Sequence, residues 1–326
     1  MSGLTSGLLR APFPWYGGKS RVADRVWGLL GSDVGRYIEP FAGSLAVLLN
    51  RPGDGAGLEV ANDTDGFIVN VWRALKHQPE LTIEWASDPR TELDLTARHL
   101  WLVNEGAARL RPHLMADPEW HDPQVAGWWL YGIAMWIGTG WCRGDGPWTR
   151  RKILGDLADD GRGVRAQLPH LGSDGQGVHA KLPHLGDDGR GVPVADSIRV
   201  LAQQLSRRLR GVLVTSGDFE RVLSDSAMRA AKGVTGVFLD PPYRQHTDEY
   251  ASQDDVEGLW QRLSAWCETN GGRSDLRVVL CGYDGDWDAP DGWQTITYTG
   301  RGTSSANRTR ERLWASPSCT GEMGLF

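Results

Sequence analysis

Short apolar segments alternate with amphipathic segments near the start of the chain. Residues 36–39 are predicted to form a strand, followed by a turn and a helix over 44–50 that Ser44 can cap. A second strand is predicted over 57–61, and apolar residues at helical spacing follow through residue 75. Two βα units in succession indicate a sheet that is covered by helices.

The same alternation returns in the last third of the chain. Helical periodicity over 195–210 leads into an apolar strand at 212–214, and two further apolar runs lie at 236–239 and 277–280. Short runs rich in β-branched residues are typical of strands that are buried on both faces of a parallel sheet. We therefore predict an α/β fold in which both ends of the chain build one doubly wound, Rossmann-like layer.

The middle of the chain, from about residue 73 to residue 194, is richer in Trp, Gly and Pro. A repeat of about 14 residues occupies about 155–193, with Gly-x-Gly-Val at 161–164, 175–178 and 189–192. Two full copies are too few for a solenoid. The segment is either a duplicated surface loop or a loop whose Arg and Lys side chains follow a phosphate backbone, and the sequence leaves both interpretations open.

Composition and charge add a few constraints. The 326 residues suit two domains, or one domain with a large insertion. The net charge of −6 means that a polyanion would have to meet a local basic surface. The four cysteines show no Cys-x-x-Cys pair, so we predict neither a metal site nor a disulfide framework.

The sequence favours a cytoplasmic protein. The first ten residues lack the basic and apolar segments of a signal peptide. Residues 125–141 carry no charge but are short for a membrane span, so a buried helix followed by a turn is the better interpretation. We expect no membrane partner and a location in the cytoplasm. If a phage encodes the protein, this would be the cytoplasm of the host cell.

Chemistry is indicated most directly by the tetrad Asp240-Pro241-Pro242-Tyr243, which follows the predicted strand at 236–239. Ligands of open α/β sheets bind beyond the carboxyl ends of the strands. A carboxylate beside a carbonyl presents two acceptors to one NH2 group, and a Tyr ring offers a face for stacking a base. A strand-ending turn capped by Asp is the alternative, and the tetrad alone does not decide between them.

Two further segments indicate a nucleoside site. The loop 39–44 lies between a strand and a helix, and Asp63 follows Gly43 at the spacing at which an acid accepts from ribose hydroxyls. The pattern is not Gly-x-Gly-x-x-Gly, so a dinucleotide is not indicated. Residues 14–19 combine two aromatic rings, a Gly pair and Lys19, but they lack the spacing of a phosphate loop, which argues against a nucleotide triphosphatase.

Taken in order, these segments resemble the Dam-like family of DNA adenine methyltransferases, which use S-adenosylmethionine. The family has a W-x-G-G-K segment, an E-P-F-x-G segment, a strand-end acid, a G-D-F segment and a D-P-P-Y tetrad. Here they appear as residues 15–19, 39–43, 63, 217–219 and 240–243. The resemblance implies a Rossmann-like methyltransferase sheet formed by 1–75 and 195–326, with a target-recognition domain inserted at 76–194.

The resemblance also implies a role for individual residues. Asp63 would hold the ribose of the cofactor, Asp218 would accept from its adenine amine, and Lys19 would lie near its methionine end. The full set of implied cofactor-binding residues is Trp15, Tyr16, Gly18, Lys19, Glu39, Pro40, Phe41, Ala42, Gly43, Ser44, Asp63, Asp218 and Phe219. No metal is implied.

The implied reaction is methyl transfer to the exocyclic amine of a flipped adenine in double-stranded DNA. Asp240, Pro241 and Pro242 would hold the target amine while Tyr243 stacks on the base. Two alternatives stay open: methylation of the 4-amino group of cytosine, and a nonenzymatic DNA-binding relative. Asp rather than Ser at the first position of the tetrad favours adenine by the same resemblance.

Basic and aromatic residues outside the tetrad are candidates for DNA contact: Arg143, Trp148, Arg162, Arg165, Lys181, Arg190, Arg301, Arg308 and Arg310. Thr139 stands where the family usually has Asn, so the base specificity cannot be carried over. No restriction-nuclease signature is apparent, and although the family takes part in restriction-modification, we expect a stand-alone modification enzyme. A monomer is the expected state.

Overall fold

The computed structural model describes residues 9–13, 15, 19–53, 57–87, 91–135, 141–142, 194–229, 233–244, 256–298 and 311–320. The chain divides into two compact units. The first, called the sheet unit, comprises Met1–Arg10, Gly17–Thr64 and Gly211–Phe326. The second, called the helical unit, comprises Ala11–Tyr16 and Asp65–Arg210. The domain boundaries inferred from the resemblance remain a prediction.

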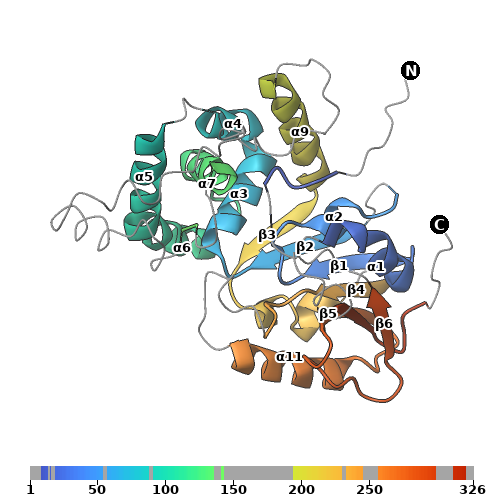
Figure 1. Cartoon of the computed structure of the whole chain (residues 1–326). Helices are drawn as coiled ribbons and strands as arrows, with labels where there is room; N and C mark the ends of the chain where they lie inside the picture. The colour runs from blue at the N-terminus through green and yellow to red at the C-terminus, as the bar shows by residue number, and fades with distance from the viewer. Residues whose placement is uncertain are drawn as a thin grey trace, which may run out of the picture. The chain divides into compact units, whose positions relative to one another are not determined.

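The sheet unit is built on a seven-stranded sheet with the order β3-β2-β1-β4-β5-β7-β6 (Figure 1). β1, β2, β3, β4 and β5 pair in parallel, and β7 runs antiparallel to both β5 and β6. This arrangement confirms the predicted α/β, Rossmann-like methyltransferase fold. The strands are β1 Val34–Glu39, β2 Leu58–Asp63, β3 Val212–Ser216, β4 Val234–Leu239, β5 Leu276–Tyr283, β6 Gln294–Tyr298 and β7 Glu311–Ala315.

The side-chain alternation of β1 explains how the sheet is covered on both faces. Tyr37 packs its ring 4.7 Å from that of Trp27 in α1 (Ala23–Leu30). Ile38 points to the opposite face and joins the buried cluster that contains Trp260 of α11 (Val256–Asn270). Because Tyr37 and Ile38 are both fully buried, β1 is covered on both faces of the sheet.

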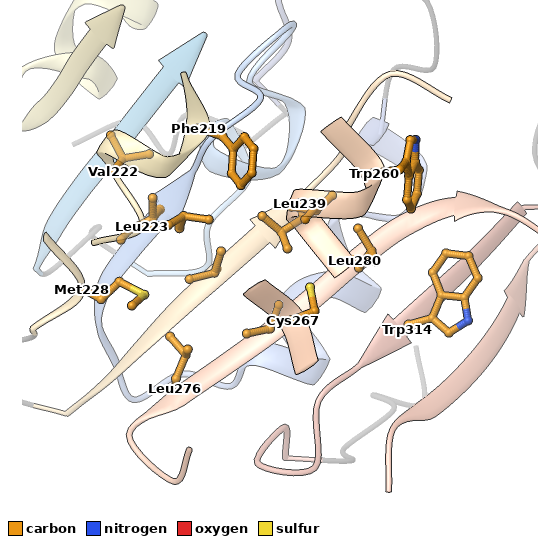
Figure 2. Close-up of a cluster of buried hydrophobic side chains, with 14 of the residues drawn as sticks. Phe219, Val222, Leu223, Met228, Leu239, Trp260, Cys267, Leu276, Leu280 and Trp314 are labelled. Carbon is orange, nitrogen blue, oxygen red and sulfur yellow. The ribbon is translucent and has the colours of Figure 1, made fainter. Parts of the chain in front are cut away.

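The main core of the sheet unit lies between α11 and the strands (Figure 2). Trp260 and Cys267 of α11 meet Leu280 of β5 there, and Phe219 and Trp314 close the cluster at its sides. Side chains of this size each contribute roughly 1.5–3 kcal/mol when fully buried. The core therefore fixes the strand ends that carry the predicted site.

The helix after β1 begins later than predicted. α2 spans Ala46–Leu49, and Leu45 precedes it in the left-handed region with φ 52°, so the expectation that Ser44 caps this helix is wrong. The buried carboxylate of Glu39 accepts instead from the backbone N–H of Leu48, at 3.1 Å. A distant acid thus satisfies an N–H that the first turn of a helix leaves without an intrahelical partner.

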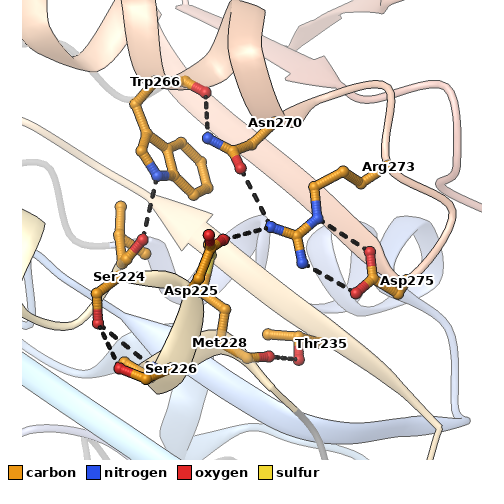
Figure 3. A network of polar contacts seen from close by, with 11 residues as sticks. Ser224, Asp225, Ser226, Met228, Thr235, Trp266, Asn270, Arg273 and Asp275 are labelled. Atoms are coloured by element: carbon orange, nitrogen blue, oxygen red, sulfur yellow. Dashed lines mark hydrogen bonds and ion pairs between the residues drawn. The ribbon is translucent and has the colours of Figure 1, made fainter.

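The amino ends of β4 and β5 are fixed by a polar network (Figure 3). Arg273 donates to both carboxylate oxygens of Asp275 and to Asp225, which begins the short helix α10 (Asp225–Met228). Thr235 of β4 donates its hydroxyl hydrogen to the carbonyl of Met228, at 2.5 Å. This network lies at the edge of the sheet opposite to the predicted site, so its role is structural.

The helical unit packs around an apolar helix, α7. Its helices are α3 Gly66–His77, α4 Pro79–Ala86, α5 Glu92–Trp101, the π-helical turn η2 Leu102–Gly106, α6 Ala107–Ala116, α7 Pro123–Met135 and α9 Val194–Leu209. Gly127 lets α7 approach α4, because a Cβ there would lie 2.3 Å from Cβ of Trp85. The buried helix predicted at the start of 125–141 is confirmed by α7. Within the described part of the chain, no helix is long and apolar enough to cross a membrane.

Candidate functional site

Two predicted segments meet at the carboxyl ends of neighbouring strands. β1 and β4 pair in parallel, and the chain leaves β1 toward β2 on one side and reaches β4 on the other. This is a topological switch point, where open α/β sheets bind their ligands. The loop 39–44 follows β1 and the tetrad 240–243 follows β4, so both lie at this edge.

The loop after β1 is held in shape by the end of β2. Ala42 donates its N–H to the carbonyl of Asn62, at 2.8 Å, and Gly43 donates to Oδ2 of Asp63, at 2.9 Å. Gly43 adopts φ 42°, a conformation that glycine adopts without steric cost. Asp63 therefore has a structural contact in addition to the ribose-binding role that the resemblance implies.

Asn62 is a residue at this edge whose contacts sequence reasoning missed. Its side chain is 1% exposed, and its Nδ2 donates to the carbonyls of Pro40, at 3.1 Å, and Gly217, at 2.8 Å. The hydroxyl of Thr215 donates to its Oδ1, at 3.0 Å. Asn62 thus ties the loops that follow β1 and β3 to the end of β2. A polar residue at the end of an apolar strand, directly before Asp63, is the signal that could have identified it.

The segment after β3 places an acid beside an aromatic ring. Asp218 accepts from the N–H of Glu220 and makes a two-point contact with the guanidinium of Arg262, at 3.0 and 3.3 Å. The ring of Phe219 is buried and lies 5.7 Å from the ring of Phe41. Arg262 comes from α11, and no motif in the sequence indicated that it would reach Asp218.

The carboxylate of Asp240 is paired with Lys19. Nζ of Lys19 lies 3.0 Å from Oδ1 of Asp240, and both side chains are largely removed from solvent. Burial raises the pKa of the Asp240 carboxyl, and the charge and hydrogen bond of Lys19 oppose that rise. The same ammonium lies 5.0 Å from the ring centroid of Tyr243. The structure therefore brings Lys19 of the first predicted segment to the tetrad.

The two prolines of the tetrad differ in their contacts. The carbonyl of Pro242 accepts from Nε1 of Trp260, at 2.9 Å, which anchors the tetrad to α11. The carbonyl of Pro242 is thus already engaged within the protein. Pro241 is therefore the residue of the pair whose carbonyl suits a target amine.

Tyr243 is packed inside the sheet unit. It is 4% exposed, its ring lies edge-on to that of Tyr283 at 4.6 Å, and its hydroxyl donates to Oδ1 of Asp240, at 3.3 Å. In this conformation protein atoms cover the ring. Stacking of Tyr243 on a base remains a prediction.

Glu39 is one of the most buried acids at this edge. It is 3% exposed, and its Oε2 accepts from the hydroxyl of Tyr37, at 3.0 Å, and from the N–H of Leu48. Burial raises the pKa of Glu39 to about 8, although both hydrogen bonds act in the other direction. The contacts of Glu39 hold α2 against β1.

The described residues fit the cofactor that the resemblance implies. Asp63 ends β2, and Asp218 follows the neighbouring parallel strand β3 by two residues, so two acceptors suited to hydroxyl and amine hydrogens lie at the same end of the sheet. The rings of Phe41 and Phe219 supply an aromatic surface beside them. Acids, aromatic rings and a glycine-containing loop form the donor and acceptor set that a nucleoside requires.

Other predicted residues lie in the helical unit or outside the described residues. Trp15 belongs to the helical unit, where its ring lies 6.0 Å from that of Phe13 and 6.3 Å from that of Trp129. Tyr16 and Gly18 lie outside the described residues. So do all the predicted DNA contacts, Arg143, Trp148, Arg162, Arg165, Lys181, Arg190, Arg301, Arg308 and Arg310, together with the repeat at 155–193. In the described ranges, no group of three or more His, Cys, Asp or Glu side chains is placed to hold a metal ion.

Comparison with known proteins adds a family match. Residues 15–97 match the family model of the D12 class N6 adenine-specific DNA methyltransferase. The matched range includes Lys19, the loop 39–44 and Asp63, whereas the G-D-F segment and the tetrad lie beyond it. A search among curated proteins finds no match. The family match confirms the resemblance to Dam-like methyltransferases and the prediction of a DNA methyltransferase enzyme.

Proposed function

Because residues 15–97 match the D12 class of N6 adenine-specific DNA methyltransferases, we propose that this chain methylates adenine in duplex DNA, with S-adenosylmethionine as the methyl donor and the target base flipped out of the helix. The observation that carries the proposal is the position of Asp240. Its partly buried carboxylate is paired with Lys19 and lies at the switch point of the sheet, at the same end as the loop 39–44. An acceptor held there suits an amine hydrogen.

The chain's own residues would bind the cofactor at the ends of β1, β2 and β3. Asp63 would accept from the ribose hydroxyls, Asp218 would accept from the adenine amine, and Phe41 and Phe219 would pack on the adenine ring. When bound, S-adenosylmethionine supplies a methyl group on a positively charged sulfur, which leaves as a neutral thioether. The acids at this edge favour that positive charge.

Asp240 and Pro241 would act on the target amine. The lone pair of an exocyclic amine is delocalised into the base, so the amine is a weak nucleophile. Acceptance of its two hydrogens by the Asp240 carboxylate and the Pro241 carbonyl would draw the nitrogen toward tetrahedral geometry and free the lone pair. As the nitrogen bonds to the methyl carbon and the carbon–sulfur bond breaks, the amine loses one proton, and Asp240 is the base within reach.

Lys19 would keep Asp240 in its ionised form, in which the carboxylate can accept hydrogen bonds from the target amine. A buried carboxyl tends to hold its proton, and a protonated carboxyl would present one acceptor fewer. The ammonium of Lys19, 3.0 Å away, stabilises the ionised form. Lys19 and Asp240 would therefore act as a pair in the reaction.

We further propose that the catalytic residues lie in 1–75 and 195–326, and that residues 76–194 recognise the DNA target. The protein would act as a monomer. The aromatic and basic content of the helical unit supports this division. Arg109, for example, lies 5.9 Å from the ring of Trp101 with its side chain half exposed. The predicted DNA contacts and a cytoplasmic location are part of the same proposal.

The test is transfer of labelled methyl from S-adenosylmethionine to unmethylated DNA, followed by digestion to nucleosides. The unaltered chain is expected to place the label in 6-methyladenine, and Asp240→Ala is expected to lose transfer. Asp225→Ala is a matched control, because Asp225 also pairs with a cation but lies at the other edge of the sheet. Label in 4-methylcytosine would show that the target base is cytosine rather than adenine. Failure to bind S-adenosylmethionine would refute it and favour a nonenzymatic DNA-binding relative.

A further inference from the structure

A chain of hydrogen bonds leads from Asp240 across the sheet. The hydroxyl of Tyr243 lies 3.3 Å from Oδ1 of Asp240 and 3.1 Å from Sγ of Cys281, and this sulfur lies 3.2 Å from the hydroxyl of Tyr298. We call these four residues the Asp240–Tyr298 chain. Cys281 is 0% exposed and Tyr298 is 7% exposed, so water does not replace these contacts.

The positions of the hydrogens in this chain follow from its two ends. An ionised carboxylate can only accept, so Tyr243 donates its single hydroxyl hydrogen to Asp240. At the other end, the hydroxyl of Tyr298 lies 3.2 Å from Sγ of Cys281 and can donate to it. Burial raises the pKa of the Cys281 thiol to about 12, so the thiol keeps its hydrogen. Cys281 therefore accepts the hydroxyl hydrogen of Tyr298 and donates its own hydrogen to the oxygen of Tyr243, whose hydroxyl hydrogen points at Asp240.

The chain has a consequence for the geometry of Asp240. Lys19 and Tyr243 both direct their hydrogens at Oδ1. Both of these contacts are made to Oδ1 rather than to Oδ2. Two donors that converge on one oxygen fix the rotation of the carboxylate and leave the other oxygen for a ligand.

We propose that Cys281 and Tyr298 are positioning residues for methyl transfer: they hold the Tyr243 hydroxyl on Oδ1 of Asp240, so that Oδ2 is presented to the target amine. The inference rests on the proposed function, since it assigns an orientation to the carboxylate that the reaction would use. It also gives the Tyr243 hydroxyl a role that is independent of stacking.

Three substitutions interrupt the chain at different points. Cys281→Ala removes the bridge, Cys281→Ser keeps a donor and acceptor of similar size, and Tyr298→Phe removes the far hydroxyl. Cys267→Ala is the matched control, because Cys267 is also 0% exposed but lies in the apolar core formed by α11. Circular dichroism and thermal unfolding establish that each variant folds.

The expected result is a change in kcat rather than in KM. Loss of one orienting hydrogen bond is expected to lower kcat of Cys281→Ala about tenfold, with KM for S-adenosylmethionine and DNA nearly unchanged. Cys281→Ser is expected to recover most of that loss, Tyr298→Phe to show a smaller decrease, and Cys267→Ala to keep the kcat of the unaltered chain. A structural role alone would lower the activity of Cys281→Ala and Cys267→Ala alike and would give no recovery with Ser. Unchanged kcat in Cys281→Ala or an equal loss in both Ala variants would overturn the inference.

A second readout separates this inference from the proposed function. The infrared S–H band of Cys281, assigned by its loss in Cys281→Ala, is expected to differ from that of Cys267 and to move in Tyr298→Phe. This measurement needs no turnover. If the unaltered chain transfers no methyl group, the proposed function fails, and the band still decides whether the chain of hydrogen bonds exists. A Cys281 band that matches that of Cys267 and does not respond to Tyr298→Phe would overturn the inference by itself.

Discussion

Replacement of Asn62 by Ala tests whether one buried amide holds the predicted cofactor site. The substitution removes two hydrogen bonds donated to the carbonyls of Pro40 and Gly217 and one accepted from Thr215. At about 1 kcal/mol for each buried hydrogen bond, the free energy of unfolding is expected to fall by about 3 kcal/mol. The carbonyls that lose their partners belong to the loops that carry Phe41 and Asp218.

The same substitution is expected to weaken cofactor binding. If about half of the lost free energy of unfolding must be supplied by S-adenosylmethionine to order the loops again, the dissociation constant of the cofactor rises about tenfold. Isothermal titration calorimetry measures this constant, and urea unfolding measures the stability. Both assays are independent of methyl transfer.

Asn70 provides the matched control. It is also fully buried, and its amide group exchanges hydrogen bonds with the backbone of Asp122 at 2.9 and 2.7 Å, within the helical unit. Asn70→Ala is therefore expected to lower stability by about 2 kcal/mol and to leave the affinity for S-adenosylmethionine unchanged. If Asn62→Ala loses stability but binds the cofactor as tightly as the unaltered chain, Asn62 does not organise a cofactor site.

Two predictions concern pH. Lys19→Met removes the cation that opposes the burial-driven rise in the pKa of Asp240. The acidic limb of the pH profile of kcat, measured by methyl transfer, should therefore move to higher pH. An acidic limb that does not move would contradict the role of Lys19. Burial raises the pKa of Glu39 from 4.5 to about 8, so its contribution to stability is full below pH 4.5 and is lost as the pH rises to about 8. Glu39→Gln keeps an acceptor for Tyr37 but does not titrate. Urea unfolding between pH 4.5 and 8 should therefore show a free energy of unfolding that depends less on pH than that of the unaltered chain.

The strands were predictable because of how they are buried. The runs at 236–239 and 277–280 lie within β4 and β5, whose residues are almost all buried, so nearly every position had to be apolar. β6 was not identified. Its residues at Gln294–Tyr298 are mostly exposed, since it lies at the edge of the sheet, and an exposed edge strand lacks a strong apolar pattern.

The site was predictable only in part, for a geometric reason. Lys19, Asp63 and Asp240 lie in short motifs, so their residue types and local spacing indicated chemistry. Asn62 and Arg262 act through contacts with residues far away in the sequence, and Cys281 reaches Tyr243 from the neighbouring strand. Such contacts depend on strand order and register, which a single sequence does not specify. The Ser44 cap failed for the same reason, because a competing acceptor came from β1.

The acids at the carboxyl edge of the sheet are each balanced in a different way. Asp63 accepts from a backbone N–H, Asp218 pairs with Arg262, Asp240 pairs with Lys19, and burial raises the pKa of Glu39 to about 8. Like charges repel one another, and the partners of Asp63, Asp218 and Asp240 reduce that repulsion at this end of the sheet. The arrangement suits a cationic sulfonium and an amine, but it disfavours phosphate.

If DNA is the substrate, its phosphates must therefore be met by other residues. The whole chain carries a net charge of −6, so its overall field does not attract a polyanion. The proposal thus requires a local basic surface among the predicted DNA contacts, for example Arg162 and Arg190 of the repeat or Arg308 and Arg310 near the C-terminus. Replacement of these arginines should then weaken DNA binding and reduce its salt dependence, without a change in the affinity for S-adenosylmethionine.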